Sequence, residues 1–419
     1  MTYIRKKVVV VGGGPAGMMA AIRASQLIKN VILVEKNNIL GKKLLLSGNG
    51  RCNLTNSKPL ELFLKGYDRN GEFLRDAFKL FFNFDLIKFF ESRQLKFITE
   101  SNGKIFPETN SASSVCNVLE KELINNNVKI IYNRQLNDII VENKKIKEII
   151  FNDGSQLPVD CLIVATGGIT YSSTGSDGKV IKLVEKLGHK IVSIHPGLVP
   201  LITDKRYPAA LEGLSLKQVR VIFEYDQKKI KSDVGDLLFT GNGISGPIIL
   251  SISEKIVELL NKGIKISASI DLIPAETEKE VEVKFMKEII NNSKKSISNV
   301  LKKSYPDRLV DLALEILEID SLLKVSQLKV SDRKKIVSFL KGINLRIIGF
   351  ESLEKAMITV GGISLKQINP RKMSSTLIDG LFFAGEMIDI NGDTGGFNLQ
   401  EAFSTGYLAG ENAAKYVLY

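Results

Sequence analysis

Residues 8–24 read VVVVGGGPAGMMAAIRA, an apolar run followed by a glycine-rich turn and a stretch that favours a helix. Gly12, Gly14 and Gly17 have G-x-G-x-x-G spacing, and a second apolar run ends in Glu35, 18 residues beyond Gly17. A strand, a glycine turn, a helix and an acid at this distance are typical of a dinucleotide-binding unit. The sequence therefore predicts an α/β fold that begins with a Rossmann-like domain.

Each residue of this motif has a physical reason. Gly12 allows a tight turn after the strand, Gly14 has no Cβ to keep a pyrophosphate away, and Gly17 lets the helix pack closely on the strand. The phosphates then face unpaired N–H groups at the positive end of the helix. The carboxylate of Glu35 can accept hydrogen bonds from both hydroxyls of an adenosine ribose.

Two further segments favour FAD over NAD as the dinucleotide. Residues 381–386 (LFFAGE) are an apolar run that ends in an acid, and a carboxylate there suits a second contact to the ribityl or pyrophosphate group of a flavin. Residues 160–168 (DCLIVATGG) are an apolar run that ends in Ala-Thr-Gly-Gly, as expected where a chain returns to a flavin-binding domain. Residues 393–398 (DTGGFN) precede a helix expected over 399–414, with Thr394 and Asn398 as its caps. The N-terminus of that helix could face the pyrimidine edge of a flavin and stabilise negative charge there.

The stretch 41–56, GKKLLLSGNGRCNLTN, resembles the signature of a bacterial family of FAD-dependent oxidoreductases. This family includes aminoacetone-oxidase-like proteins and flavoproteins of bile-acid dehydroxylation, within the superfamily of flavoproteins with two dinucleotide-binding folds. The resemblance covers nearly the whole chain, and it continues in GKIFP at 103–107, HPGLVPL at 195–201, GDLLFT at 235–240 and GDTGGFN at 392–398.

The resemblance implies FAD contacts from six segments of the chain. These are Gly12, Gly14, Pro15, Ala16, Gly17, Glu35, Lys36, Lys43, Ser47, Gly48, Asn49, Arg51, Asn53, Ala165, Thr166, Gly167, Gly168, Gly385, Glu386, Thr394, Gly395, Gly396, Phe397 and Asn398. Arg51 fits this role because a guanidinium is a planar, permanently charged donor for a pyrophosphate. The alternative for an isolated arginine is a surface ion pair.

The sequence identifies no catalytic acid or base. Asp393 and Tyr171 are near the flavin-binding segments, but a structural hydrogen bond is the more common role of such loop residues. Residues 241–246 repeat the glycine spacing, yet we expect Pro247 to interrupt any helix after them. A separate NAD(P) domain is therefore not predicted, and NAD(P)H would bind transiently over the flavin.

The leading hypothesis is an oxidoreductase that transfers hydride between a small organic substrate or NAD(P)H and an acceptor, through non-covalently bound FAD. An amine-type oxidase would release hydrogen peroxide, whereas a reductase of bile-acid-like enones would depend on NAD(P)H. Two alternatives remain: a tRNA-modifying flavoprotein, and a protein that binds FAD without catalysis. A small-molecule substrate is the expected partner, and the oligomeric state is not indicated.

Composition limits the class of protein. The chain has 419 residues, of which 44% are hydrophobic and 25% charged, as in a globular protein of two or three domains. No apolar run is long enough to span a membrane, and no signal peptide is recognisable, so we expect a cytoplasmic, bacterial protein. The three cysteines lack C-x-x-C spacing, and the two histidines lack the spacing of metal ligands.

The formal net charge of +12 raises the question of a nucleic-acid partner. The basic clusters are short, dispersed along the chain and without interleaved aromatic residues, which disfavours a dedicated nucleic-acid site. They are Lys42-Lys43, Lys144-Lys145, Lys228-Lys229, Lys302-Lys303 and Arg333-Lys334-Lys335.

The pattern along the chain predicts three parts. Residues 1–195 and 346–419 are expected to form a discontinuous FAD-binding domain, 196–275 an inserted β-barrel-like domain, and 276–345 a helical subdomain. Finer expectations include a strand meander over 128–132, 136–142 and 147–151, glycine-rich turns at 235–246, and a core role for Phe81, Phe82, Phe84, Phe89 and Phe90.

Overall fold

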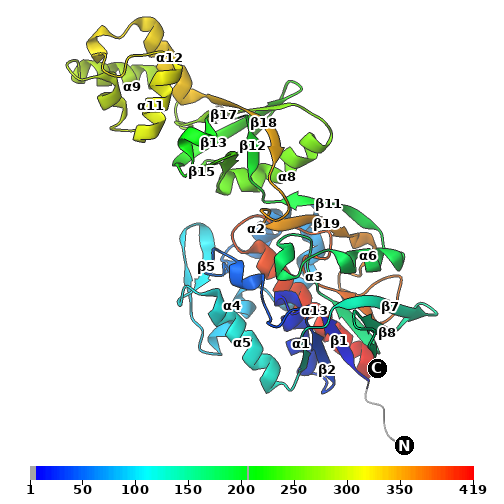
Figure 1. The fold of residues 1–419 in the computed structure, drawn as a ribbon. Coiled ribbons are helices and arrows are strands. Elements are labelled where there is room, and N and C mark those ends of the chain that lie inside the picture. Colours follow the sequence, from blue (N-terminus) through cyan, green and yellow to red (C-terminus); the bar gives the residue numbers. More distant parts are fainter. Residues whose placement is uncertain (1–5, 205–206) are drawn as a thin grey trace, which may run out of the picture. The chain divides into compact units, whose positions relative to one another are not determined.

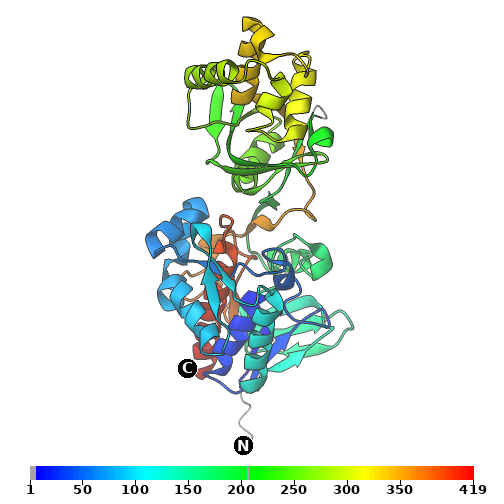
Figure 2. The same cartoon turned by 90° about the vertical axis from the view of Figure 1, so that its left-hand side faces the viewer.

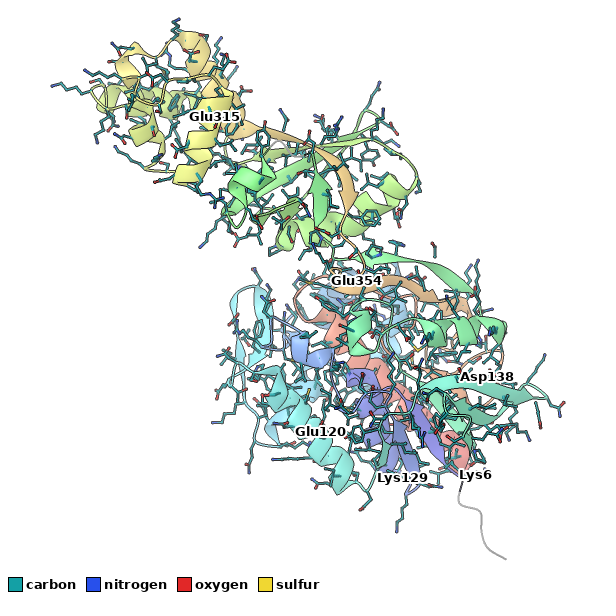
Figure 3. All side chains as sticks on the ribbon, viewed as in Figure 1. Lys6, Glu120, Lys129, Asp138, Glu315 and Glu354 are labelled. Carbon is teal, nitrogen blue, oxygen red and sulfur yellow. The ribbon has the colours of Figure 1, made fainter. Side chains whose placement is uncertain are left out.

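The computed structural model describes residues 6–204 and 207–419, and the chain forms two compact units (Figure 1). The first unit contains the chain up to Gly197 together with Leu353–Tyr419, and the second contains Leu198–Ser352. The domain limits expected from the sequence were 195/196 and 345/346, whereas these units divide at 197/198 and 352/353. Charged side chains lie on the surfaces of both units, for example Lys129 and Asp138 in the first and Glu315 in the second (Figure 3).

A five-stranded parallel sheet forms the centre of the first unit. Its order is β20-β10-β1-β2-β6, so that the N-terminal strand lies in the middle and a strand from near the C-terminus lies at one edge. Its members are β1 (Val8–Val11), β2 (Val31–Val34), β6 (Lys129–Ile131), β10 (Cys161–Val164) and β20 (Leu381–Phe383). Because helices cover parallel sheets, the strands are continuous apolar runs, and β1, β2, β10 and β20 are buried throughout. This confirms the predicted α/β fold.

Helix α13 (Phe397–Leu418) packs directly against α1 (Pro15–Ser25), and the two lie side by side in both views of the fold (Figures 1 and 2). Gly406 and Gly410 make this approach possible, since a Cβ at either position would collide with the carbonyl oxygen of Ala16 or Ala20. The last segment of the chain is thereby fixed to the first helix. The unit also contains α5 (Ala112–Asn125), which packs against α1, and α6 (Lys179–Lys186).

A phenylalanine-rich region lies between the signature stretch and α5. It contains α2 (Leu60–Leu64), η2 (Lys65–Leu74), α3 (Arg75–Leu80), α4 (Asn83–Glu91) and a sheet of β3 (Thr55–Asn56), β4 (Phe97–Thr99) and β5 (Lys104–Pro107). Phe81 and Phe90 are buried as expected, but Phe84 is 70% exposed. The expected core role of Phe84 is therefore wrong, because this residue lies in the first turn of α4 and faces outward.

The predicted meander differs from the observed one. Its strands are β7 (Leu136–Glu142), β8 (Lys145–Phe151) and β9 (Gln156–Pro158), while the expected first strand at 128–132 is β6 of the central sheet, paired with β2. A separate two-stranded sheet joins β11 (Ile191–Gly197) to β19 (Ile358–Ile363). Short 3₁₀ turns are η1 (Leu44–Leu46), η3 (Ser101–Gly103), η4 (Ser172–Thr174) and η6 (Leu365–Gln367).

The second unit contains an antiparallel barrel. Its ring runs β13-β15-β16-β12-β18-β17 and closes because β13 also pairs with β17, with β14 attached as a hairpin. The strands are β12 (Leu201–Thr203), β13 (Ser215–Tyr225), β14 (Lys228–Lys231), β15 (Gly235–Thr240), β16 (Gly243–Ser245), β17 (Ile266–Asp271) and β18 (Ile343–Phe350). Residues 235–246 thus contain two strands rather than only turns. The barrel-like insertion is confirmed.

Helices accompany the barrel. These are α7 (Pro208–Leu211), α8 (Pro247–Asn261), α9 (Glu278–Asn291), α10 (Ile297–Leu301), α11 (Asp307–Ile316) and α12 (Val330–Lys341), with η5 (Val325–Gln327). Pro247 is the first residue of α8, so the expectation that it interrupts a helix is wrong: proline is well tolerated at that position. Within the described ranges, no helix has the length and apolar character needed to cross a membrane.

Candidate cofactor site

The carboxyl ends of four strands bring the predicted site residues to one edge of the central sheet. Val11 pairs with Val34 on one side and Val164 on the other, and Val164 pairs with Phe383. The segments that follow these strands therefore begin side by side. In open α/β sheets this edge is where ligands bind. Four predicted segments therefore meet at this edge although they are far apart in the sequence. They are the glycine turn at 12–17, Glu35, the A-T-G-G segment at 165–168 and the A-G-E segment at 384–386.

The glycines of the first turn have three different environments. A Cβ at Gly12 would collide with the carbonyl oxygen of Ala165, and a Cβ at Gly17 would collide with the carbonyl oxygen of Gly12. A Cβ at Gly14 would have no described protein atom within 4 Å. Gly14 precedes α1, whose first residue is Pro15. The absence of a side chain at Gly14 therefore serves something other than protein packing, and a pyrophosphate above the N-terminus of α1 fits that space.

Neighbouring residues hold Glu35 in place at the end of β2. Its Oε2 accepts a hydrogen bond from the Gly13 N–H at 2.7 Å, and its Oε1 accepts from the Asn37 backbone and side chain at 2.8 and 2.7 Å. The Asn37 amide also donates to the carbonyl of Thr174 at 2.9 Å. Because a carboxylate has about four acceptor positions, these three bonds leave one position, on Oε2, for a hydroxyl of a ribose.

An ion pair joins the signature stretch to the A-G-E segment. Lys43 Nζ lies 2.6 Å from Glu386 Oε2 and 2.7 Å from Thr170 Oγ1, while Glu386 Oε1 accepts from the Thr359 N–H at 2.8 Å. Thr359 Oγ1 in turn accepts from the Ile169 N–H at 2.8 Å. The sequence pointed to Lys43 and Glu386, but neither Thr170 nor Thr359, which fix the pair, was among the predicted site residues.

The other predicted residues of this edge lie around that pair. Gly167 has a φ of +75°, and a Cβ there would lie 2.9 Å from Ser176 Oγ and 3.8 Å from Glu386 Oε2; a Cβ at Gly168 would collide with Thr359. Lys36 pairs with Asp177 at 3.1 Å. Further predicted positions are also here: Ala16 packs close to Gly385, Ala165 follows β10, and the Thr166 hydroxyl lies 3.2 Å from the sulfur of Met387.

The middle of the signature stretch is a loop with left-handed backbone. Gly48 and Asn49 have φ values of +57° and +56°, both are exposed, and Ser47 Oγ donates to the Leu44 carbonyl at 2.7 Å. Arg51 already has partners: its guanidinium lies 2.5 Å from Glu100 Oε1 and 4.2 Å from the centre of the Phe106 ring. The structure thus places Arg51 in the ion pair that was the alternative to a pyrophosphate contact.

The end of the signature stretch contacts the loop before α13. The Asn53 amide, oriented to satisfy both partners, accepts from the Gly396 N–H at 3.2 Å, and the Asn56 amide donates to the Gly395 carbonyl at 3.1 Å. Behind this contact, Thr55 Oγ1 donates to Gln400 Oε1 at 2.6 Å in the buried interior. The loop that carries the predicted residues 394–398 is therefore attached to the last residues of the signature stretch, which include β3.

The predicted caps of α13 are wrong. The helix begins at Phe397, with Gly396 before it at a φ of +99° and without a side-chain capping bond. Asn398 instead accepts from the Gly392 N–H and donates to the Gly392 carbonyl, both at 2.8 Å, which closes the preceding loop. Thr394 is half-buried in that loop. Phe397 is buried 4.4 Å from the ring centre of Phe63, so its side chain packs inside the protein.

Two buried groups near this edge escaped the sequence reasoning. Burial raises the pKa of Glu401 to about 8, against a smaller opposing effect from its bond with Thr405. Thr405 Oγ1 also accepts from the Gly385 N–H at 3.0 Å, which links the helix to the A-G-E segment. Tyr67 is buried and donates to the Phe397 carbonyl at 2.7 Å.

Burial raises the pKa of the Cys52 thiol to about 12, which disfavours a nucleophilic thiolate.

Comparisons with known proteins agree with this architecture. The family model described as the HI0933-like protein Rossmann domain matches residues 6–412. A 3-dehydro-bile acid delta(4,6)-reductase from Clostridium scindens is 31% identical over 408 residues, covering 97% of this chain and 98% of the relative. A ribosomal RNA dihydrouridine synthase from Haemophilus influenzae is 29% identical over 407 residues, covering 95% of this chain and 96% of the relative.

A solved structure shows the same fold at low identity. A 3-ketosteroid delta1-dehydrogenase from Sterolibacterium denitrificans has a TM-score of 0.52 and 13% identity, with 98% of this chain and 99% of that chain covered. The relationship to a reductase along nearly the whole chain confirms the predicted class of enzyme, an oxidoreductase. With its β-α-β unit and a family match over residues 6–412, the chain belongs to the HI0933-like family of Rossmann-domain proteins.

Proposed function

We propose that this oxidoreductase binds FAD non-covalently at the carboxyl edge of its parallel sheet and reduces a carbon–carbon double bond conjugated to a carbonyl group. The observation that carries the cofactor assignment is the environment of Gly14, whose missing side chain leaves space at the N-terminus of α1. The neighbouring Gly12 and Gly17 are instead required by protein packing.

The residues present suit the parts of FAD. The N-terminus of α1 would hold the pyrophosphate, and Glu35 would accept hydrogen bonds from the ribose. The signature stretch, the A-T-G-G segment, the A-G-E segment and the loop before α13 would surround the remainder. When bound, FAD supplies the hydride and electron transfer, while the protein supplies position and electrostatics. The ion pair between Lys43 and Glu386 would place two charged side chains beside the cofactor. Thr170 holds the lysine and the Thr359 N–H holds the glutamate.

The type of reaction is suggested by the relatives. The name of the Clostridium scindens protein denotes reduction of ring double bonds in a 3-dehydro bile acid, and the Haemophilus influenzae protein makes dihydrouridine in ribosomal RNA. Both reactions saturate a double bond conjugated with a carbonyl. This shared chemistry favours a reductase over an amine-type oxidase and over a protein that binds FAD without turnover.

We further propose NADH or NADPH as the electron donor, bound transiently. The glycines at 241–246 do not form a second dinucleotide site of the Rossmann type, because β15 and β16 on either side of Gly241 are antiparallel strands of the barrel. A second candidate substrate is a uracil base in RNA. The Haemophilus influenzae relative and a group of basic side chains in the second unit favour it.

Anaerobic stopped-flow absorbance tests the proposal. The purified yellow protein is mixed with NADH or NADPH, and bleaching of the flavin band is expected. The reduced protein is then mixed with a 3-keto bile acid that carries a conjugated double bond, or with uridine-containing RNA, and reoxidation is followed. If neither nucleotide bleaches the flavin band and an amine such as aminoacetone does, the protein is an amine oxidase and not a reductase.

A further inference from the structure

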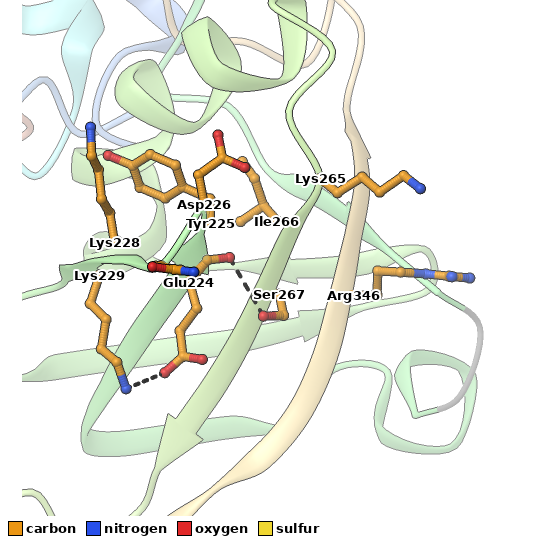
Figure 4. Close-up of a pocket in the computed structure, with 10 residues that line it drawn as sticks. Glu224, Tyr225, Asp226, Lys228, Lys229, Lys265, Ile266, Ser267 and Arg346 are labelled. Carbon is orange, nitrogen blue, oxygen red and sulfur yellow. Dashed lines mark hydrogen bonds and ion pairs between the residues drawn. The ribbon is translucent and has the colours of Figure 1, made fainter.

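The barrel of the second unit has a basic pocket on its outer surface. The pocket has a volume of about 460 Å³ and is lined by ten residues, among them Lys228, Lys229, Lys265 and Arg346 (Figure 4). We call these four side chains the basic face. They come from three separate parts of the sequence: Lys228-Lys229 is one of the short basic clusters noted above, whereas Lys265 and Arg346 belong to none of them.

The strand register explains how they come together. Lys229 pairs with Glu224, Glu224 with Ser267, and Ser267 with Arg346, so these four residues form one row across β14, β13, β17 and β18. The intervening positions of β13, β17 and β18, such as Phe223 and Ala268, point into the barrel and are buried. Because neighbouring strands are roughly 4.8 Å apart, the row is about 14 Å long.

The charge of the pocket is positive. Lys229 Nζ lies 2.5 Å from Glu224 Oε1, and this pair is neutral. Among the described residues, Lys228, Lys265 and Arg346 have no ion-pair partner, and Asp226 is the second acid of the pocket lining. Asp204 also faces this region, since its Oδ1 accepts from the Arg346 N–H at 3.2 Å. The remaining lining groups near the row include the neutral Ser267 and Tyr225.

We propose that the basic face binds the phosphate backbone of an RNA. Its cations are exposed, and in Figure 4 they extend in different directions rather than toward one point. Lys228 lies on β14 and Arg346 on β18, at opposite ends of the four strands of this row, so the unpaired cations are spread over more than the width of one phosphate group and suit an anion with successive phosphates better than a single phosphate. Arginine and lysine contacts to phosphate supply affinity without base specificity. The inference rests on the proposed function only for the choice of RNA, because the binding itself needs no turnover.

Fluorescence anisotropy of a labelled single-stranded RNA, with the full FAD-bound chain, tests this directly. The triple variant K228E/K265E/R346E should bind at least about tenfold more weakly than the unsubstituted protein. Its slope of log K against log salt should fall by about 2, as expected for three lost contacts to single-stranded phosphates. Flavin absorbance and circular dichroism show whether the variant is folded and still holds FAD.

A matched control separates a local site from general attraction. The variant K279E/K287E/K294E makes the same change of net charge in the second unit, at exposed lysines outside the basic face. It should keep most of the affinity. Equal losses in both variants, no RNA binding by the unsubstituted protein, or complete competition by inorganic phosphate would each overturn the proposal. Failure of flavin reduction in stopped flow would overturn the proposed function and leave RNA binding standing.

Discussion

Lys43 and Glu386 form an ion pair, with 2.6 Å between Nζ and Oε2, although 343 positions separate them in the chain. The pair lies where the signature stretch meets the end of β20, and Thr170 and the Thr359 N–H hold its two sides. Both side chains are about one quarter exposed, at 26% and 22%. The pair is thus positioned by both ends of the chain and is accessible to a ligand.

Replacing Lys43 with Met should weaken FAD binding more than it weakens the fold. The partly exposed pair contributes about 1 kcal/mol or less to stability, because water screens it. We expect about tenfold weaker FAD binding, measured by quenching of flavin fluorescence, and a small change in the thermal midpoint of the FAD-free protein. The control is K147M, which breaks the exposed Lys147–Glu142 pair at 3.6 Å. Equal FAD affinity in K43M and K147M would contradict a role of Lys43 at the cofactor.

Gly14→Val should abolish FAD binding without unfolding the protein. A Cβ at this position meets no described atom within 4 Å apart from its chain neighbours, so we expect the new side chain to clash with a ligand in that space rather than with the protein. Gly12→Val is the matched variant, since Gly12 has a φ of +110° and its Cβ would collide with Ala165. We expect that variant to lose about 3 kcal/mol or more of stability. Flavin content after purification and chemical denaturation measure the two effects. Unchanged flavin content in Gly14→Val would place the cofactor elsewhere.

Much of the first unit could be predicted from the sequence because its signals are local. Buried parallel strands are continuous apolar runs, and Gly17 is required by a backbone contact with Gly12 close in the chain, although the contact that requires Gly12 comes from the distant Ala165. The carboxyl edge then follows from the parallel arrangement alone. The same reasoning failed for residues 128–132, because a three-residue strand carries no sign of which sheet it joins, and β6 pairs with β2.

The site was less predictable where the partners of a side chain come from distant parts of the sequence. Arg51 has the chemistry of a phosphate ligand, but Glu100 and Phe106 hold it, and no local pattern indicated them. Asn398 had the composition of a cap, yet the loop at Gly392 uses its side chain. The basic face was missed for the same reason: Lys228, Lys265 and Arg346 are far apart in the sequence, and only the folding of the barrel brings them into the lining of one pocket.

Gly406→Val should destabilise the first unit strongly. A Cβ at Gly406 would collide with the Ala16 carbonyl, so α13 would have to move away from α1. Overpacking of this kind costs about 1–3 kcal/mol, and loss of the α1 contact would also displace the start of α13 beside the predicted flavin site. Urea denaturation should show the loss, and FAD affinity should fall with it. The control is Leu418→Ala in the same helix, where the side chain is 55% exposed and little change is expected.

The buried carboxyl of Glu401 should make stability depend on pH in a defined direction. Burial raises its pKa to about 8 in the folded protein, above the value of about 4.3 for an unfolded chain. The folded state therefore binds the proton more tightly than the unfolded state between these values. Stability should fall as the pH rises from about 5 to 8, and the neutral variant Glu401→Gln should remove this contribution.

The expected gain of Glu401→Gln over the unsubstituted protein is small at pH 5 and on the order of 5 kcal/mol at pH 8.5, measured by urea denaturation of the FAD-free protein. Glu411→Gln, in the same helix, is the control with the opposite sign. Its bonds with Lys415 and Arg23 hold the pKa of Glu411 below the usual value, despite burial. That variant should be less stable at neutral pH, with a difference that shrinks as the pH falls through the pKa of the folded state. Parallel pH profiles for both variants would mean that Glu401 is ionised in the folded protein at neutral pH.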